Sequence, residues 1–149
     1  MFNWFKSPQL SKADEQQIVR GIQAAEKDTR AEIRVHIARR LKANSALSEA
    51  QEIFNSLGMH STELRNGVLL YVCLREKKFA IVGDIGIHSH VSETFWNAVR
   101  DEMQLLFAEG KVASAICHGI GRAGEKLQEY FPADGNHNPN ELSDEISRS

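Results

Sequence analysis

The sequence predicts an α/β protein, a three-layer α/β/α sandwich of Rossmann-like character around a small mixed sheet. An alternating segment at 32–38 and a continuous apolar run at 68–74 have the patterns of β-strands. Helical periodicity fills the stretches before, between and after these two segments. A third apolar segment, at 79–82, follows the apolar run after only four polar residues, so these two strands are predicted to form a hairpin.

The composition is that of one domain of ordinary size. Of 149 residues, 42% are hydrophobic, which is enough to bury one core. The 18 basic and 20 acidic side chains are interspersed and sum to a formal charge of -2, so nucleic acid is not an expected partner. The domain is expected at 10–132, between an N-terminal arm at 1–9 and a flexible polar tail at 133–149.

Neither a targeting segment nor a membrane span is expected. Polar residues follow the aromatic side chains of the N-terminal arm, where a signal peptide would continue with an apolar core. No stretch approaches the roughly 20 apolar residues that a membrane span requires. We therefore expect a cytoplasmic protein in which Cys73 and Cys117 are reduced and act as small buried side chains.

The first helix and the first strand have clear local signals. Ser11 and Asp14 form an approximate capping box, which predicts that a helix begins there and continues to about residue 27. In the strand at 32–38, apolar side chains alternate with Arg34 and His36, so one face of the strand is expected in the core. The apolar positions are Ile33, Val35 and Ile37.

Three further helices are expected. Apolar residues at helical spacing predict one at 46–57, with Gly58 at its C-terminal end. A second apolar stripe runs from Phe95 to Phe107, before Gly110. The last helix begins near Val112 and ends at Phe131-Pro132, because proline disfavours helical geometry in the residue before it.

Polar side chains gather at one end of the predicted sheet. If one helical crossover joins the first two strands, these strands are parallel, and the hairpin makes the third strand antiparallel. The starts of the first two strands then meet the end of the third, which brings Glu32, Asn66 and Asp84 together. Glu26, at the end of the first helix, is expected to reach the same neighbourhood.

Asp84 stands in the sequence Gly83-Asp84-Ile85-Gly86, where the backbone can approach an ion closely. Oxygen ligands suit a hard divalent cation, calcium or magnesium, better than zinc. The alternative is that Asp84 is present because Asp and Gly form turns. A zinc site at His88 and His90 is a further alternative, and two histidines in a polar loop are more often solvated.

Two segments match the sequence patterns of known binding sites but lack the structural context of those sites. Residues 119–124 spell G-x-G-x-x-G, but they lie in a helical pattern and not after a strand, so we interpret the glycines as positions of close helix packing. Acidic and amide residues from Asp134 to Glu145 follow the spacing of an EF-hand loop. Pro139 occupies the place of its essential glycine, which favours chance spacing in a polar tail.

Taken together, these segments resemble the TPM domain family, also labelled TPM phosphatase, and most closely its soluble, stand-alone members. The resemblance covers nearly the whole chain. The residues that carry it are Leu10-Ser11, Glu26 to Ile33, Phe54 with Leu57-Gly58-Met59, Arg65 to Leu69, Gly83 to Gly86, and Asn140-Glu141-Leu142.

The resemblance implies an α/β/α sandwich, a divalent ion bound in some members, and a proposed acid phosphatase activity. It supports Glu32 and Asp84 best as ligands of the ion, and Asn66 and Glu26 less well. Calcium is preferred over magnesium. Two functions follow as hypotheses: a cation-binding domain with weak phosphatase activity, and a non-enzymatic domain that binds a protein partner through 1–5 or 133–149.

Overall fold

The structure, a computed structural model of the chain, describes residues 10–133 and 145–149. The N-terminal arm and most of the segment with EF-hand-like spacing lie outside these residues. The elements are, in chain order, α1 (Lys12–Glu26), β1 (Glu32–Ala38), α2 (Ala46–Ser56), the 3-10 helix η1 (Met59–Ser61), β2 (Gly67–Cys73), β3 (Lys78–Gly83), α3 (Ile85–His88), α4 (Glu93–Ala108), α5 (Val112–Tyr130) and β4 (Ser147–Arg148).

The sheet has the strand order β3-β2-β1-β4. β1 and β2 are parallel, and β2 and β3 are antiparallel, so the predicted crossover and hairpin are both confirmed. β4 pairs in parallel with β1 at His36 and Ile37. β4 lies in the segment expected to be a flexible polar tail, and it was not predicted because two polar residues are too few to show the alternation of a strand.

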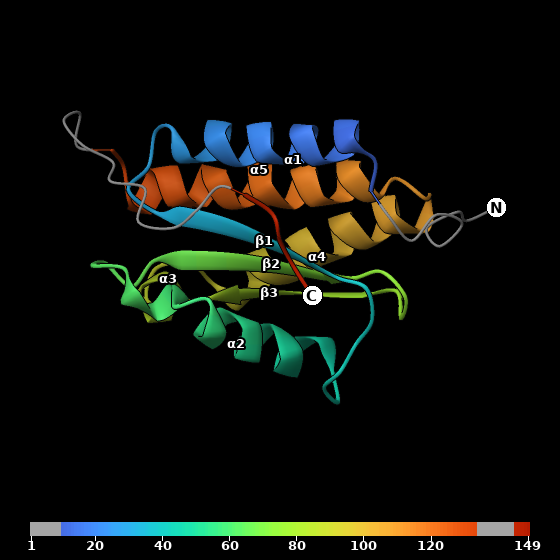
Figure 1. The fold of residues 1–149 in the computed structure, drawn as a ribbon. Helices are drawn as coiled ribbons and strands as arrows, with labels where there is room; N and C mark the ends of the chain where they lie inside the picture. Colours follow the sequence, from blue (N-terminus) through green and yellow to red (C-terminus); the bar gives the residue numbers. More distant parts are fainter. Residues whose placement is uncertain (1–9, 134–144) are drawn as a thin grey trace.

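Helices cover both faces of the sheet (Figure 1). α1, α4 and α5 pack on one face, against side chains such as Ile33, Val35 and Leu70. On the other face, α2 packs with Phe54 and Ala50 against a second group of buried residues. That group includes Leu69, Tyr71, Cys73 and Ala80. The mixed sheet between these two helical layers confirms the predicted three-layer α/β/α sandwich.

Local signals explain where the helices begin and end. Ser11 and Asp14 make the reciprocal capping box that their spacing predicts. Gly58 has a φ of 67°, the left-handed conformation that favours glycine after the end of α2. Within the described residues, none of the helices is long and apolar enough to cross a lipid bilayer.

The glycines of the G-x-G-x-x-G string lie inside α5, which excludes the strand-to-helix turn of a dinucleotide-binding site. A Cβ added at Gly124 would lie 2.9 Å from the Cβ of Ala25 on α1, and one at Gly119 would lie 2.6 Å from the sulfur of Met103. Close helix packing is therefore confirmed at these two positions. Gly121 has nothing within 4 Å of such a Cβ, so it plays no packing role.

Candidate functional site

The predicted polar end of the sheet forms as expected, and we call it the acidic end. It comprises Glu32, Asn66 and Asp84. Glu32 of β1 pairs with Gly67 of β2, and the Asp84 N–H donates to the Gly67 carbonyl at 3.0 Å. Three strands thus bring together side chains that are 52 residues apart in the chain, from Glu32 to Asp84.

Glu32 and Asp84 lie on the same face of the sheet. Residues directly opposite one another on neighbouring strands point to the same face, so Glu32, Gly67 and Asp84 share one. It is the α2 face, because Leu69, two residues after Gly67, packs in the cluster beneath α2. Gly67, which lies between the two acidic residues in the sheet, has no side chain.

Asp84 is buried and carries several contacts at once. Its carboxylate accepts two hydrogen bonds from Arg65, at 2.8 and 2.9 Å, and one from the N–H of Ile85 at 2.7 Å. The last contact makes Asp84 the N-cap of α3, which the sequence analysis described only as a turn. The Arg65 side chain, in contrast to the buried Asp84, is 49% exposed. The buried carboxylate is therefore neutralised by a guanidinium that lies half in water.

Gly86 holds the turn against the start of β2. Its N–H donates to the Arg65 carbonyl at 2.8 Å, and a Cβ at Gly86 would lie 2.5 Å from the carbonyl oxygens of Leu64 and Arg65. No side chain fits in that space. Glycine is therefore required at this position by the close approach of two backbone segments, and the contact fixes Asp84 relative to Arg65.

Glu26 and Asn66 are both buried and bonded to the backbone. Glu26 Oε2 accepts from the N–H of Ile33 at 2.7 Å, on the side of β1 that faces away from β2. Asn66 donates through Nδ2 to the Arg30 carbonyl at 3.4 Å, between the starts of β1 and β2. The fold thus places Asn66 at the acidic end, whereas Glu26 supports the outer edge of β1.

No ready-made metal cluster is present in the part of the chain that the structure describes. Within residues 10–133 and 145–149, no three His, Cys, Asp or Glu side chains are grouped closely enough to hold an ion. His90 Nδ1 lies 3.0 Å from the Gly86 carbonyl, and its ring contacts Tyr130 and Phe131. An ion at the acidic end would therefore require side chains to move.

The cysteines have the inert character that the sequence predicts. Cys73 and Cys117 are free thiols. Burial raises the pKa of Cys73 to about 11, and the nearby Glu76 carboxylate acts in the same direction. Burial also raises the pKa of Cys117. A protonated thiol is a poor nucleophile, so covalent catalysis by cysteine has no support here.

A second polar cluster, which was not predicted from the sequence, lies beneath α2. Glu49 accepts from the Tyr71 hydroxyl at 2.5 Å and from the N–H groups of Lys42 and Ala43. Burial alone raises the pKa of Glu49, but these hydrogen bonds outweigh it and lower the pKa. The signal in the sequence is weak, because Glu49 lies among the ordinary polar residues at the start of a helix.

His36 continues this cluster toward β4. Its ring stacks on Tyr71, and its two nitrogens lie 2.7 Å from Ser147 Oγ and 2.8 Å from Ser149 Oγ. Burial lowers the pKa of His36 to about 4, and the positive charges of Arg34 and Lys42 act in the same direction against Glu49. The ring is therefore neutral near pH 7.

Comparisons with known proteins show the family and the fold of this chain. The family model of the TPM domain matches residues 7–126. The chain is 38% identical to the BA42 protein of the psychrophilic bacterium Bizionia argentinensis, whose solution structure superposes with a TM-score of 0.85. The alignment covers 94% of this chain and 95% of BA42. No curated protein matches the chain.

Two more distant solution structures share the fold. The N-terminal domain of a P. gingivalis protein has a TM-score of 0.68 at 16% identity, covering 82% of this chain and 78% of that one. The N-terminal domain of the cg2496 protein of Corynebacterium glutamicum has a TM-score of 0.60 at 14% identity. Here the coverage is 81% of this chain and 76% of the other.

The fold and the site define a class of protein, an α/β/α sandwich with buried carboxylates where β1 begins and where β3 ends. The chain belongs to the TPM domain family, as the match over residues 7–126 establishes.

Proposed function

We propose that this TPM domain binds a divalent cation at the acidic end, with Glu32 and Asp84 as ligands. One observation supports the proposal above all others. Two buried carboxylates point to the same face of the sheet on either side of Gly67. Burying carboxylates is costly unless a positive charge or strong donors accompany them, so a cation is a fitting partner.

The spacing suits a bridging ion. Two strand separations of about 4.8 Å put the backbones of Glu32 and Asp84 roughly 10 Å apart. Two metal–oxygen bonds of about 2.4 Å leave roughly 5 Å for the two side chains to cover. One aspartate and one glutamate together reach that far. The Oδ1 atom of Asn66 and water would complete the coordination shell. Glu26, which accepts a hydrogen bond from the Ile33 N–H on the side of β1 away from β2, would hold the start of β1 in place.

Arg65 would compete with the cation for the Asp84 carboxylate. Its guanidinium now neutralises Asp84, and a divalent ion would have to displace it. Because the Arg65 side chain is already half exposed, turning it into water uncovers less buried surface than moving a core side chain would. Calcium suits such a site better than magnesium, since calcium accepts irregular shells of six to eight oxygens whereas magnesium demands a strict octahedron.

A calcium titration followed in the amide spectrum tests the proposal. We expect saturable shifts at Glu32, Asn66 and the residues around Asp84, and their loss in Asp84→Asn. Glu93→Gln removes a carboxylate that is 66% exposed on α4, so this control should titrate like the wild type. No shift at the acidic end at millimolar calcium, or equal shifts in Asp84→Asn, would contradict cation binding there.

Phosphate-ester hydrolysis is the activity that such a site would support. A bound cation would polarise the phosphoryl oxygens and neutralise the charge that develops as the ester bond breaks. The phosphatase label of the matching family model agrees with this chemistry. Calcium-dependent release of nitrophenol from p-nitrophenyl phosphate should be lost in Asp84→Asn. Activity that survives this substitution would come from another site or from a contaminant.

A further inference from the structure

Among the described residues, no strand pairs with the outer edge of β3. β3 is an outer strand of the sheet, and the Asp84 N–H donates to the Gly67 carbonyl across β2 and β3. Because pairing alternates along an antiparallel ladder, Val82 and Ala80 also face β2 with their backbone groups. The N–H and C=O groups of Ile81 and Phe79 therefore point outward, away from the sheet.

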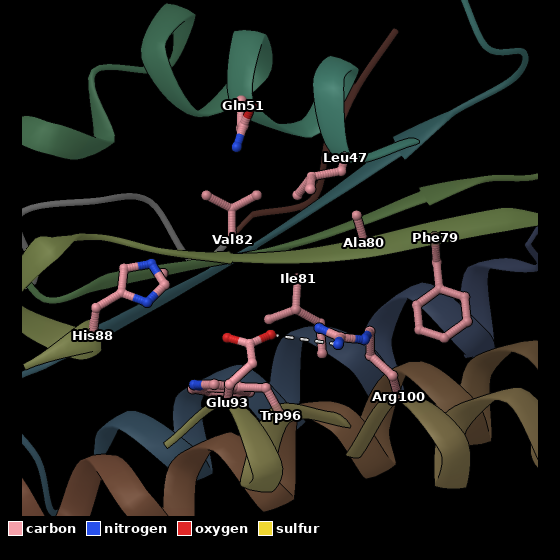
Figure 2. Close-up of a pocket in the computed structure, with 11 residues that line it drawn as sticks. Leu47, Gln51, Phe79, Ala80, Ile81, Val82, His88, Glu93, Trp96 and Arg100 are labelled. Carbon is pink, nitrogen blue, oxygen red and sulfur yellow. Dashed lines mark hydrogen bonds and ion pairs between the residues drawn. The ribbon is translucent and has the colours of Figure 1, made fainter. Parts of the chain in front are cut away.

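This edge is the floor of a groove, which we call the β3 groove. α2 and α4 form its two walls, and the cavity between them has a volume of about 360 Å³. Figure 2 shows β3 running between the walls, with Val82 and Ala80 toward α2 and Ile81 and Phe79 on the opposite side. Residues on the walls include Leu47, Gln51, Trp96 and Arg100.

The groove walls are largely apolar, apart from Gln51, His88 and an exposed ion pair of 3.4 Å between Glu93 and Arg100. Leu47 is 52% exposed although it is a large hydrophobic residue, and it lies beside the strand. Arg100 lies toward the Phe79 end in Figure 2, and His88 lies toward the Val82 end. Lys78, the first residue of β3, is exposed and adds a positive charge next to Phe79 at this end of the strand.

The shape decides between two occupants. A second copy of this chain would have to bring its own β3 edge, and that edge lies between its own α2 and α4. Pairing of the two edges would bring α2 and α4 of both copies against one another along the groove, which disfavours this occupant. A single extended peptide has no such flanking walls, and one strand fills the spacing of about 4.8 Å next to β3.

We infer that the β3 groove binds an extended peptide segment of a partner protein by strand addition to β3, with acidic residues at the C-terminal end of the segment. The bound segment runs antiparallel to β3, so its C-terminal end lies beside Phe79. There, Lys78 supplies complementary charge, and Arg100 can exchange its exposed partner Glu93 for an acidic residue of the segment. Its backbone pairs with Ile81, and an apolar side chain packs on Leu47.

Hydrogen exchange on the full chain provides the test. The probe is a peptide of about eight residues, alternating valine and threonine and ending in two aspartates. A matched peptide ends in two lysines. At 90% saturation with the first peptide, we expect exchange of the Ile81 and Phe79 amides to slow by about tenfold. The Val82 and Ala80 amides, which already pair with β2, should change little, and the lysine peptide should bind more weakly.

Two substitutions separate backbone pairing from side-chain contact. Ile81→Pro removes an outward N–H, which an edge strand tolerates, and should abolish binding while the sheet remains intact. Ile81→Ala retains that N–H and should bind. Arg100→Glu should reverse the preference between the two peptides. Arg100 lies outside the acidic end, so calcium binding should be unchanged in all three variants.

Three results would overturn the inference. The first is that neither peptide slows the Ile81 and Phe79 amides at millimolar concentration. The second is that Ile81→Pro binds the aspartate peptide as well as Ile81→Ala does. The third is protection of these amides that rises with protein concentration in the absence of peptide, because that result would assign the groove to a second copy of the chain.

Discussion

Arg65 and Asp84 form a two-point ion pair at the acidic end, with Nε 2.8 Å from Oδ2 and Nη2 2.9 Å from Oδ1. The pair joins the loop before β2 to the turn after β3. It also places a replaceable positive charge on a buried carboxylate, because Arg65 is half exposed while the Asp84 side chain is only 5% exposed. If Asp84 binds a cation, Arg65 must compete for the same oxygens.

Replacing Arg65 should therefore strengthen calcium binding. We expect Arg65→Gln to lower the calcium dissociation constant by about tenfold, since the neutral amide no longer competes by charge for Asp84. Calorimetric titration measures the change. Arg100→Gln, which removes a guanidinium from the surface of α4, is the matched control and should leave the constant unchanged. Weaker binding in Arg65→Gln would show that Arg65 supports the site.

The Tyr71 hydroxyl should contribute measurably to stability. Tyr71→Phe leaves Glu49 Oε2 without its donor in a buried place, at an expected cost of about 1–3 kcal/mol. Urea unfolding at pH 7 measures the loss. Tyr130→Phe removes a hydroxyl from the surface of α5, where Tyr130 is 38% exposed, and should cost much less. Equal losses in the two variants would contradict the role of the buried pair.

His36 should make stability depend on pH between about 6.5 and 4. Burial lowers the pKa of His36 to about 4, so the folded protein keeps the ring neutral while the unfolded chain takes up a proton below pH 6.5. The contribution of His36 to the free energy of unfolding is therefore present above pH 6.5 and is lost on acidification, by about 2 kcal/mol at pH 5.

Urea unfolding of the wild type and of His36→Gln at pH 7.5 and pH 5 isolates this contribution. Glutamine retains a polar side chain near Ser147 and Ser149 but has no proton to gain. The difference between the two pH values should therefore shrink by about 2 kcal/mol in the variant. The same pH dependence in both proteins would assign it to other groups.

Two glycines of α5 should respond in opposite ways to alanine. Gly124→Ala puts a Cβ 2.9 Å from that of Ala25, so α1 and α5 must separate and thermal stability should fall. Gly121→Ala meets nothing within 4 Å and should stabilise the helix by about 0.5–1 kcal/mol through backbone entropy. Calorimetric melting compares the two. Destabilisation by Gly121→Ala would contradict the packing described here.

Much of the fold could be predicted because its signals are local. Each of three signals can be recognised from a few residues: the capping box at Ser11, the alternation around Val35, and Gly58 after the end of α2. The meeting of Glu32 and Asp84 at one end of the sheet also followed, because crossover handedness and the hairpin fix it. These features do not depend on side-chain detail.

What the sequence did not reveal depends on distant partners. Arg65 carries no local sign that it pairs with Asp84, and its contact is set by the close packing of Gly86 on the preceding loop. β4 forms because His36 and the backbone of β1 meet residues more than 100 positions later. Such pairings depend on the three-dimensional fold, and neither hydrophobic periodicity nor turn-forming residues in the sequence reveal them.

A crystal structure grown in millimolar calcium tests the central claim most directly. We expect an ion between the carboxylates of Glu32 and Asp84 on the α2 face of the sheet, with the Arg65 guanidinium displaced into solvent. An Arg65–Asp84 pair that persists at saturating calcium, with no ion at the acidic end, would contradict it.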